Sequence, residues 1–454
     1  MRVLVFGTGK LYLKNREKFS EMEIVAFLDN DLKKQGTLLD GKMIDVPDHI
    51  AKYEYDFIVI VSVHYKEMRE QLVKLGIERR VIIDAENKGD WENLRKVKRY
   101  EWEENDVADR KVLLITHDFS LTGAPMVLYY AAKILKKSGY GVFVYSKRDG
   151  MLKYDYLNNK ISVSIFDDYN FTERAIQKYF SGYQIILANT VTLFHLVKSL
   201  EKVNTPVLWW LHEEDNVYAE YGIERIPQYG LLHVYGVSNR AESSYIKYSG
   251  SAEIGRLVYG LPNKAYKIQG NEKKSRAKIV FAIVGCVSER KGHDVFISAI
   301  KKNWSAWKDR AEFWMIGSIS ERQKSEMRDL SEVRVFGSID HEELLKLYSE
   351  MDVVVCPSRN DPMPVVLAEG MMNRKVCIAS DMTGTAEKIE QYKNGLICRA
   401  GDVDSLSDQI EWVLCNTEKL ETMGEAAYKV YLKEFSYEQF EKNMLKIMDQ
   451  IAEV

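Results

Sequence analysis

The chain has 454 residues, of which 46% are hydrophobic and 29% are charged, so it can bury large cores and is long enough for two or three domains. Its formal net charge of -3 gives no basic excess for binding nucleic acid. The five cysteines form no CxxC pair, which favours reduced, structural thiols. No apolar run reaches the roughly 18 residues of a membrane span, and the N-terminus opens as a strand rather than as a signal peptide. We therefore expect a cytoplasmic protein.

Alternating strand and helix patterns over residues 1–100 predict a small Rossmann-like domain. Its first strand ends in Gly7-Thr-Gly9, and an acid, Asp29, follows the second strand, which together form the first half of a dinucleotide fingerprint. Tyr12 occupies the place of the third glycine. The domain resembles the nucleotide-binding-type domains that precede some sugar-modifying enzymes. A degenerate domain that serves in packing, dimerisation or docking of a partner subunit is the alternative interpretation.

The next segment predicts a ligand-facing turn between a strand, Lys111–Thr116, and a helix. His117, Thr122 and Gly123 lie in this turn, where a small residue leaves room for a ligand and the helix start offers free N–H groups. Further on, His212 directly follows an apolar strand and precedes two acids. A lone histidine in that position is usually structural or solvated.

Arg290 and Lys291 precede a predicted helix that begins at His293. Two cations beside the free N–H groups of a helix N-terminus favour a diphosphate. The segment is not a P-loop, because Arg290 stands where the pattern GxxxxGK[ST] requires glycine. Two solvated surface cations are the alternative.

The segment Asp361-Pro-Met-Pro-Val-Val-Leu-Ala-Glu369 lies between an apolar strand and a predicted helix over Val365–Met372. In an open parallel sheet such a loop lies at the carboxyl edge, where ligands bind. Two carboxylates eight positions apart can accept hydrogen bonds from several hydroxyl groups of one ligand, such as a sugar nucleotide. An ordinary surface acid followed by a helix acid is the alternative.

This segment resembles the acid-x7-Glu motif of retaining glycosyltransferase family 4, with Asp361 in place of the usual first Glu and Pro364 where glycine is most frequent. Cys286 stands where the family often has arginine. The resemblance extends over roughly residues 111–435. It implies an α/β fold of GT-B architecture, with two facing Rossmann-like domains preceded by the small third one. The implied domains are 1–100 (accessory), 110–262 (acceptor), 263–435 (donor) and 436–454, a helix that crosses back to the acceptor domain.

The resemblance also implies a retaining, hexosyltransferase-type enzyme that moves a sugar from a nucleotide-diphosphate sugar to a glycan or lipid-linked acceptor, without a cofactor or a metal. Bacterial surface polysaccharide or glycoconjugate biosynthesis is the usual setting, and the inner face of the membrane is an alternative location. A homo-oligomer or a partner subunit held through the N-terminal domain is also expected. The implied catalytic residues are His212, Asp361, Arg290 and Lys291. The implied donor contacts also include Gly123, Gly384, Thr385 and Glu369, and the implied acceptor side is His117 and Thr122.

Two other functions stay open at this point. A non-catalytic GT-B partner subunit is favoured by the departures at Asp361, Pro364 and Cys286. A sugar-nucleotide epimerase or a phosphorylase would bind the same donor without transferring its sugar to a second sugar or lipid.

Overall fold

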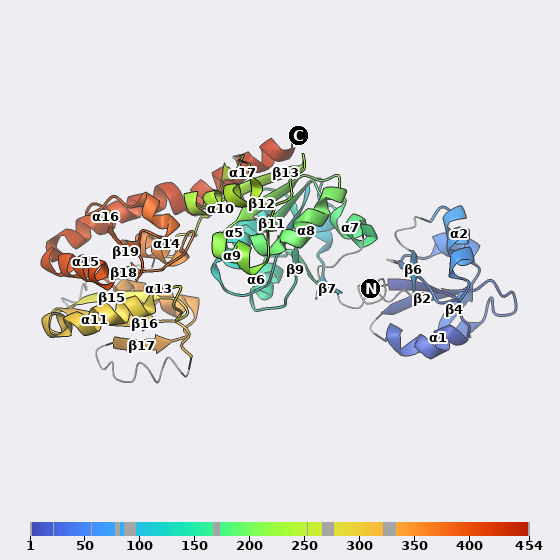
Figure 1. Ribbon diagram of the computed structural model, residues 1–454. Helices are drawn as coiled ribbons and strands as arrows, with labels where there is room; N and C mark the ends of the chain where they lie inside the picture. The colour runs from blue at the N-terminus through green and yellow to red at the C-terminus, as the bar shows by residue number, and fades with distance from the viewer. Residues whose placement is uncertain are drawn as a thin grey trace.

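The computed structural model contains three α/β bodies, each built on its own sheet (Figure 1). It describes residues 2–20, 22–55, 57–77, 82–85, 97–166, 173–251, 253–265, 277–320 and 333–452. The N-terminal body lies apart from the other two, which are joined by the long helix α17 (Figure 1).

The N-terminal sheet has the strand order β3-β4-β2-β1-β5-β6, and only the β3–β4 pair is antiparallel among its described strands. Asp29 accepts a hydrogen bond from the Thr8 N–H at 3.0 Å and pairs with Lys34 at 3.0 Å, so its carboxylate closes the glycine turn from within the protein. Tyr12 packs edge-on against Phe27 at 4.9 Å, and thus fills the space that a third glycine would leave open. The elements are β1 (Arg2–Phe6), α1 (Lys10–Asn15), β2 (Glu23–Leu28), β3 (Leu38–Leu39), β4 (Lys42–Asp45), β5 (Phe57–Ile60), α2 (Tyr65–Lys74) and β6 (Ile82–Asp84).

The middle body, called here the N-terminal half, has an eight-stranded sheet in the order β14-β13-β12-β11-β8-β9-β10-β7. Its strands are parallel except β7, which pairs antiparallel with β10. Apolar side chains fill both faces, as expected of a parallel sheet covered by helices. The strands are β7 (Val97–Tyr100), β8 (Lys111–Thr116), β9 (Gly141–Ser146), β10 (Ser162–Phe166), β11 (Ile185–Asn189), β12 (Val207–Leu211), β13 (Leu232–Gly236) and β14 (Gly255–Arg256). The helices are α4 (Glu103–Asp106), α5 (Gly123–Lys137), α6 (Leu152–Asn158), α7 (Glu173–Phe180), α8 (Phe194–Ser199), α9 (Asp215–Glu220) and α10 (Asn239–Ser249).

The last body, called here the C-terminal half, has a parallel sheet in the order β17-β16-β15-β18-β19-β20. Its order reverses between β15 and β18, so the loops that follow these two strands face the same crevice. The strands are β15 (Ile279–Val284), β16 (Ala311–Ile316), β17 (Val333–Gly337), β18 (Val353–Cys356), β19 (Val376–Ser380) and β20 (Leu396–Cys398). The helices are α11 (His293–Trp307), α13 (His341–Glu350), α14 (Val365–Met372), the 3-10 helix η6 (Gly384–Lys388), α15 (Val403–Cys415), α16 (Leu420–Val430) and α17 (Tyr437–Ala452).

Helix α17 belongs to the core of the N-terminal half, although it follows the C-terminal half in the chain. Phe440 stacks on Trp210 with ring centroids 5.5 Å apart, and the fully buried Met444 and Met448 continue the same face. Lys137 of α5 also pairs with Glu441 at 2.8 Å. The two facing α/β halves confirm the predicted GT-B architecture.

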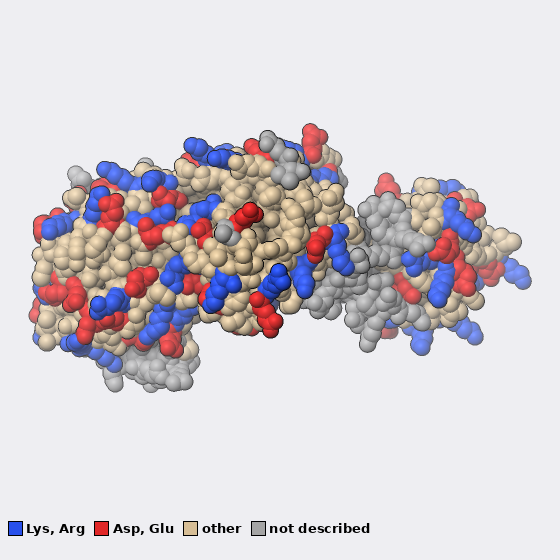
Figure 2. Space-filling model, turned by 45° about the horizontal axis from the view of Figure 1, so that its top comes forward, with Lys and Arg blue, Asp and Glu red and all other residues tan. Residues whose placement is uncertain are grey.

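The surface carries both signs of charge, and blue and red side chains alternate over the face shown in Figure 2. Within the described ranges, none of the helices is both long enough and apolar enough to cross a bilayer.

Candidate functional site

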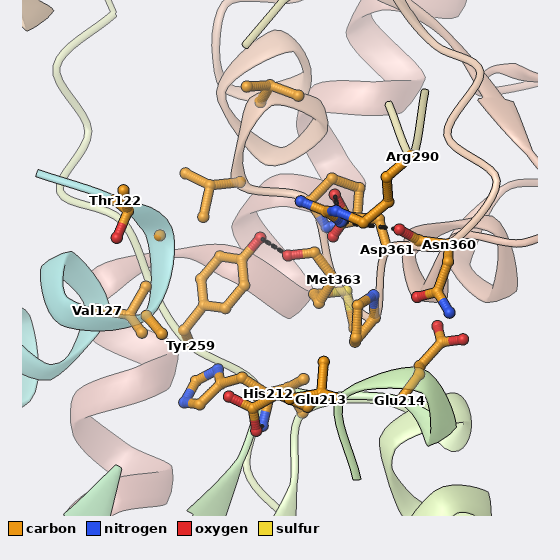
Figure 3. Close-up of a pocket in the computed structure, with 18 of the residues that line it drawn as sticks. Thr122, Val127, His212, Glu213, Glu214, Tyr259, Arg290, Asn360, Asp361 and Met363 are labelled. Carbon is orange, nitrogen blue, oxygen red and sulfur yellow. Dashed lines mark hydrogen bonds and ion pairs between the residues drawn. The ribbon is translucent and has the colours of Figure 1, made fainter. Parts of the chain in front are cut away.

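A cavity of about 450 Å³ lies between the N-terminal and C-terminal halves (Figure 3). Its size falls within the range of small-molecule sites. The polar residues that line it from the N-terminal half include His117, Thr122, His212, Glu213, Glu214 and Asn216, and those from the C-terminal half are Arg290, Lys291, Asn360 and Asp361. Gly123 also lines it. Seven of the ten residues predicted for the site therefore meet in one place.

The C-terminal side of the cavity is an ion cluster. Lys291 pairs directly with the Asp361 carboxylate, and Arg290 lies 3.6 Å from the same oxygen. Burial lowers the pKa of Lys291, but the charge of Asp361, its hydrogen bond to the lysine and the nearby Cys356 together outweigh burial, and the pKa is raised. The lysine is therefore a fixed cation at the cavity wall.

A close contact between two loops holds Lys291 in place. The next residue, Gly292, has a φ of +73°, and a Cβ atom there would come within 2.2 Å of the Pro357 carbonyl oxygen. Only glycine fits this position. The loop after β15 thus packs on the loop after β18, which brings the two cations to Asp361.

The loop that carries Asp361 is tied to the turn before η6 by its backbone. Asp361 donates its N–H to the Met382 carbonyl at 3.2 Å, and its own carbonyl accepts the Gly384 N–H at 2.9 Å. A Cβ atom on Gly384 would lie 1.6 Å from the Pro362 oxygen. The family resemblance implies that Gly384 contacts the donor, but in this structure its N–H is already used within the protein.

Glu369 and Thr385, two other predicted donor contacts, do not line the cavity. Glu369 is buried in α14 and accepts a hydrogen bond from the Tyr348 hydroxyl at 2.9 Å. Thr385 is fully buried, and its hydroxyl lies 3.4 Å from the sulfur of Met363. Their roles in donor binding stay predictions.

On the N-terminal side, His212 stands at the carboxyl end of β12 and faces the cavity (Figure 3). Its Nε2 lies 2.8 Å from Oδ1 of Asn189, and its ring packs on Trp210 at 4.6 Å. Burial, with His117 nearby, lowers the pKa of His212 to about 3. The imidazole is therefore neutral at physiological pH.

The turn after β8 supplies the neighbouring wall. Burial also lowers the pKa of His117, whose Nε2 lies 3.5 Å from Asp118. Thr122 precedes α5, and its hydroxyl lies 2.7 Å from that of Ser120. A Cβ atom on Gly123 would touch Val365 of the other half at 3.6 Å, so the two halves approach closely here.

Glu213 is a site residue that the sequence prediction missed. One carboxylate oxygen accepts the backbone N–H groups of Val191, at 2.9 Å, and His212, at 3.0 Å. Burial raises the pKa of Glu213 to about 7, although these two hydrogen bonds oppose the shift. The adjacent Glu214 is instead held by Arg240 in a two-point contact at 2.6 and 2.8 Å. In the sequence, only the position of Glu213 directly after His212, at the end of a strand, indicated that it could belong to the site.

Two family matches cover the two halves that build this cavity. Residues 108–246 match the family described as "Glycosyl-transferase family 4", and residues 266–430 match "Glycosyl transferases group 1". The chain is a glycosyltransferase of the GT-B fold. The N-terminal body of this glycosyltransferase matches a separate family, "C2185-like, N-terminal", over residues 1–83.

Individual relatives agree with this assignment. The glycosyltransferase is 27% identical over 303 residues to an uncharacterized glycosyltransferase of Methanocaldococcus jannaschii, an alignment that covers 61% of this chain and 81% of the relative. It is 27% identical over 151 residues to the alpha-D-kanosaminyltransferase of Streptomyces kanamyceticus, covering 32% of this chain and 38% of that enzyme.

Solved structures share the fold. HepE of Anabaena, in complex with UDP and glucose, superposes with a TM-score of 0.63 at 18% identity, covering 75% of this chain and all of HepE. WaaG, a glycosyltransferase involved in lipopolysaccharide biosynthesis, superposes with a TM-score of 0.57 at 13% identity, covering 74% of this chain and 99% of WaaG.

Proposed function

We propose that this glycosyltransferase transfers a hexose from a nucleotide-diphosphate sugar to a hydroxyl group of a glycan or lipid-linked acceptor, with retention of the anomeric configuration. The observation that carries the proposal is the convergence of Lys291 and Arg290 on one wall of the cavity, opposite the neutral His212. HepE, solved with UDP and glucose, supports the choice of a nucleotide-sugar donor.

Departure of the diphosphate is the step that this charge would assist. As the bond between the anomeric carbon and the phosphate oxygen breaks, negative charge grows on the diphosphate, and prepositioned cations stabilise it. Lys291 and Arg290 provide that charge without a metal ion, and the N-terminus of α11 adds the positive end of its dipole. The acceptor oxygen then bonds to the anomeric carbon, and its proton leaves with the departing phosphate.

Asp361 has two roles in this scheme. Without donor it neutralises Lys291 and Arg290, so the cavity does not hold an uncompensated pair of cations. When the diphosphate of the donor pairs with Lys291, the Asp361 carboxylate becomes free to accept hydrogen bonds from sugar hydroxyl groups. Assembly of a surface polysaccharide or glycoconjugate in bacteria is the setting that we propose, and WaaG is a structural neighbour of that kind.

Thermal unfolding with UDP, dTDP and GDP, each free and with a hexose attached, tests the proposal. A ligand at 100 times its dissociation constant stabilises the folded state by about 2.7 kcal/mol, which shifts a melting curve visibly. We expect one nucleotide to raise the melting temperature of the wild type and of Lys393→Ala, an exposed lysine of the same half, but not of Lys291→Ala.

Product analysis then separates the alternatives. Transfer to an added acceptor with an unchanged anomeric configuration, read by proton NMR, supports the retaining transferase. Conversion of the donor alone would identify an epimerase. A wild type that responds to none of the nucleotides would contradict the proposal and favour the non-catalytic partner subunit.

A further inference from the structure

Asn189 connects two segments of the N-terminal half that line the cavity, the start of α5 after β8 and the loop after β12. It ends β11, is fully buried, and lies in register with Trp210 of the neighbouring strand, two residues before His212. Its Nδ2 donates a hydrogen bond to the Ala124 carbonyl at 2.9 Å, in the first turn of α5. Its Oδ1 lies 2.8 Å from Nε2 of His212.

These two contacts fix the direction of the amide. A carbonyl oxygen cannot donate, so the Asn189 atom that faces Ala124 must be the NH₂ group, and the atom that faces His212 must be the oxygen. An amide oxygen only accepts hydrogen bonds, so Nε2 of the neutral His212 must carry the proton.

The second ring nitrogen of His212 is then a lone-pair acceptor. Nδ1 makes no hydrogen bond to any part of the chain that the structure describes, and the ring lines the cavity together with Arg290 and Asp361 of the other half. Burial keeps the ring neutral. A ligand in the cavity therefore meets an acceptor at this point.

We propose that Asn189 is a positioning residue that holds His212 in the Nε2-protonated form, and that the sugar consequently presents a hydrogen-bond donor, a hydroxyl or amino group, to His212 Nδ1. A carboxylate at that position would place two acceptors against each other, so the site selects neutral hexoses or amino sugars over hexuronates. This selection rests on the proposed use of a nucleotide-sugar donor, whereas the tautomer of His212 follows from the two hydrogen bonds of Asn189 alone.

The tautomer is tested first, by two-bond ¹H–¹⁵N NMR on protein labelled with ¹⁵N-histidine, with the His212→Ala variant to assign the signal. We expect one neutral, Nε2-protonated ring that does not titrate between pH 5 and 8. In Asn189→Ala we expect mixed tautomers, while the melting temperature reports whether that variant folds. An Nδ1-protonated ring in the wild type would overturn the proposal.

Asn189→Asp tests the same contact by placing a carboxylate beside Nε2, which stabilises the imidazolium and turns Nδ1 into a donor. The charged or titratable groups that line the cavity with this ring are His117, Glu213, Glu214 and Tyr259 of the N-terminal half and Arg290, Lys291 and Asp361 of the C-terminal half, and all are unchanged in this variant. His212 should now titrate in the NMR experiment. An unchanged spectrum would contradict the proposed contact.

Sugar selection is tested with the nucleotide that binds in the Lys291 experiment, as its hexose and its hexuronate. The wild type should bind the hexose form more tightly by roughly tenfold or more, and Asn189→Asp below the new histidine pKa should reduce this ratio. Affinity for the free nucleotide should not change, because the side chain of Asn189 bonds to Ala124 and His212 and not to Lys291. Equal wild-type affinity for the two sugar forms would refute the selection, whereas failure of every free nucleotide to bind would refute the proposed function instead.

Discussion

Replacing Glu213 with glutamine should remove a penalty on folding that grows with pH. The pKa of Glu213 is about 7 in the folded protein against an ordinary value of 4.5, so the unfolded chain releases this proton first as the pH rises. The free energy of unfolding of the wild type is free of this penalty below pH 4.5, where Glu213 is protonated in both states. The wild type then loses stability as the pH rises from 4.5 through 7, where the folded protein must also release the proton. One pKa unit corresponds to about 1.36 kcal/mol, so the wild type should lose about 2.5 kcal/mol relative to Glu213→Gln between pH 5 and pH 8.

Glutamine suits this comparison because its amide oxygen can still accept the Val191 and His212 N–H groups. Urea unfolding at pH 5, 6, 7 and 8 measures the difference, and Glu220→Gln, an exposed acid on the adjacent α9, serves as the control. The control should track the wild type at every pH. The reasoning is refuted if the gap between Glu213→Gln and the wild type stays constant across this range, because Glu213 would then ionise alike in both states.

Three further outcomes follow from the geometry. Tyr348→Phe should lower the free energy of unfolding by about 1 to 3 kcal/mol in urea titrations, because Glu369 loses the hydrogen bond from the buried Tyr348 hydroxyl. A loss no larger than that of Tyr154→Phe, a substitution of an exposed tyrosine, would argue against a stabilising role of this hydrogen bond. Gly384→Ala should lower the free energy of unfolding by about 1 to 3 kcal/mol and weaken nucleotide-sugar binding in calorimetry, since the added Cβ would push on Pro362 beside Asp361. Unchanged affinity would show that the loop adapts. Transfer should survive dialysis against EDTA, and a loss restored by Mg²⁺ would contradict charge neutralisation by Lys291 and Arg290 alone.

The sequence predicts the elements that depend on local pattern. Strand-terminal glycines, apolar β runs and the prolines before Val365 predict the parallel sheets and place Lys291 and Asp361 at the same sheet edge. The helix at Val365–Met372 has the predicted bounds. Each of these features is specified within a few residues of chain, where turn chemistry and side-chain periodicity act directly.

The rest depends on packing between distant segments. Nothing near Asn189 in the sequence predicts that its amide spans Ala124 and His212, which are 65 and 23 residues away. The raised pKa of Glu213 likewise arises from burial, and the hydrogen bond between Tyr348 and Glu369 joins two helices, α13 and α14, that are separate in the sequence. The donor contact predicted at Gly384 rests on resemblance alone, whereas the hydrogen bond from its N–H to the Asp361 carbonyl arises from the packing of the neighbouring loop.

The position of α17 has a consequence for biosynthesis. The N-terminal half begins with β7 at Val97, yet its core includes Phe440, Met444 and Met448, which lie on a helix synthesised more than three hundred residues later. While the ribosome translates the C-terminal half, the apolar surface around Trp210 stays uncovered. The C-terminal half can complete its own core first, and the nascent chain then exposes a hydrophobic surface on the N-terminal half until translation has passed α17. A chaperone that binds such surfaces would therefore meet this protein late in its synthesis, at the N-terminal half.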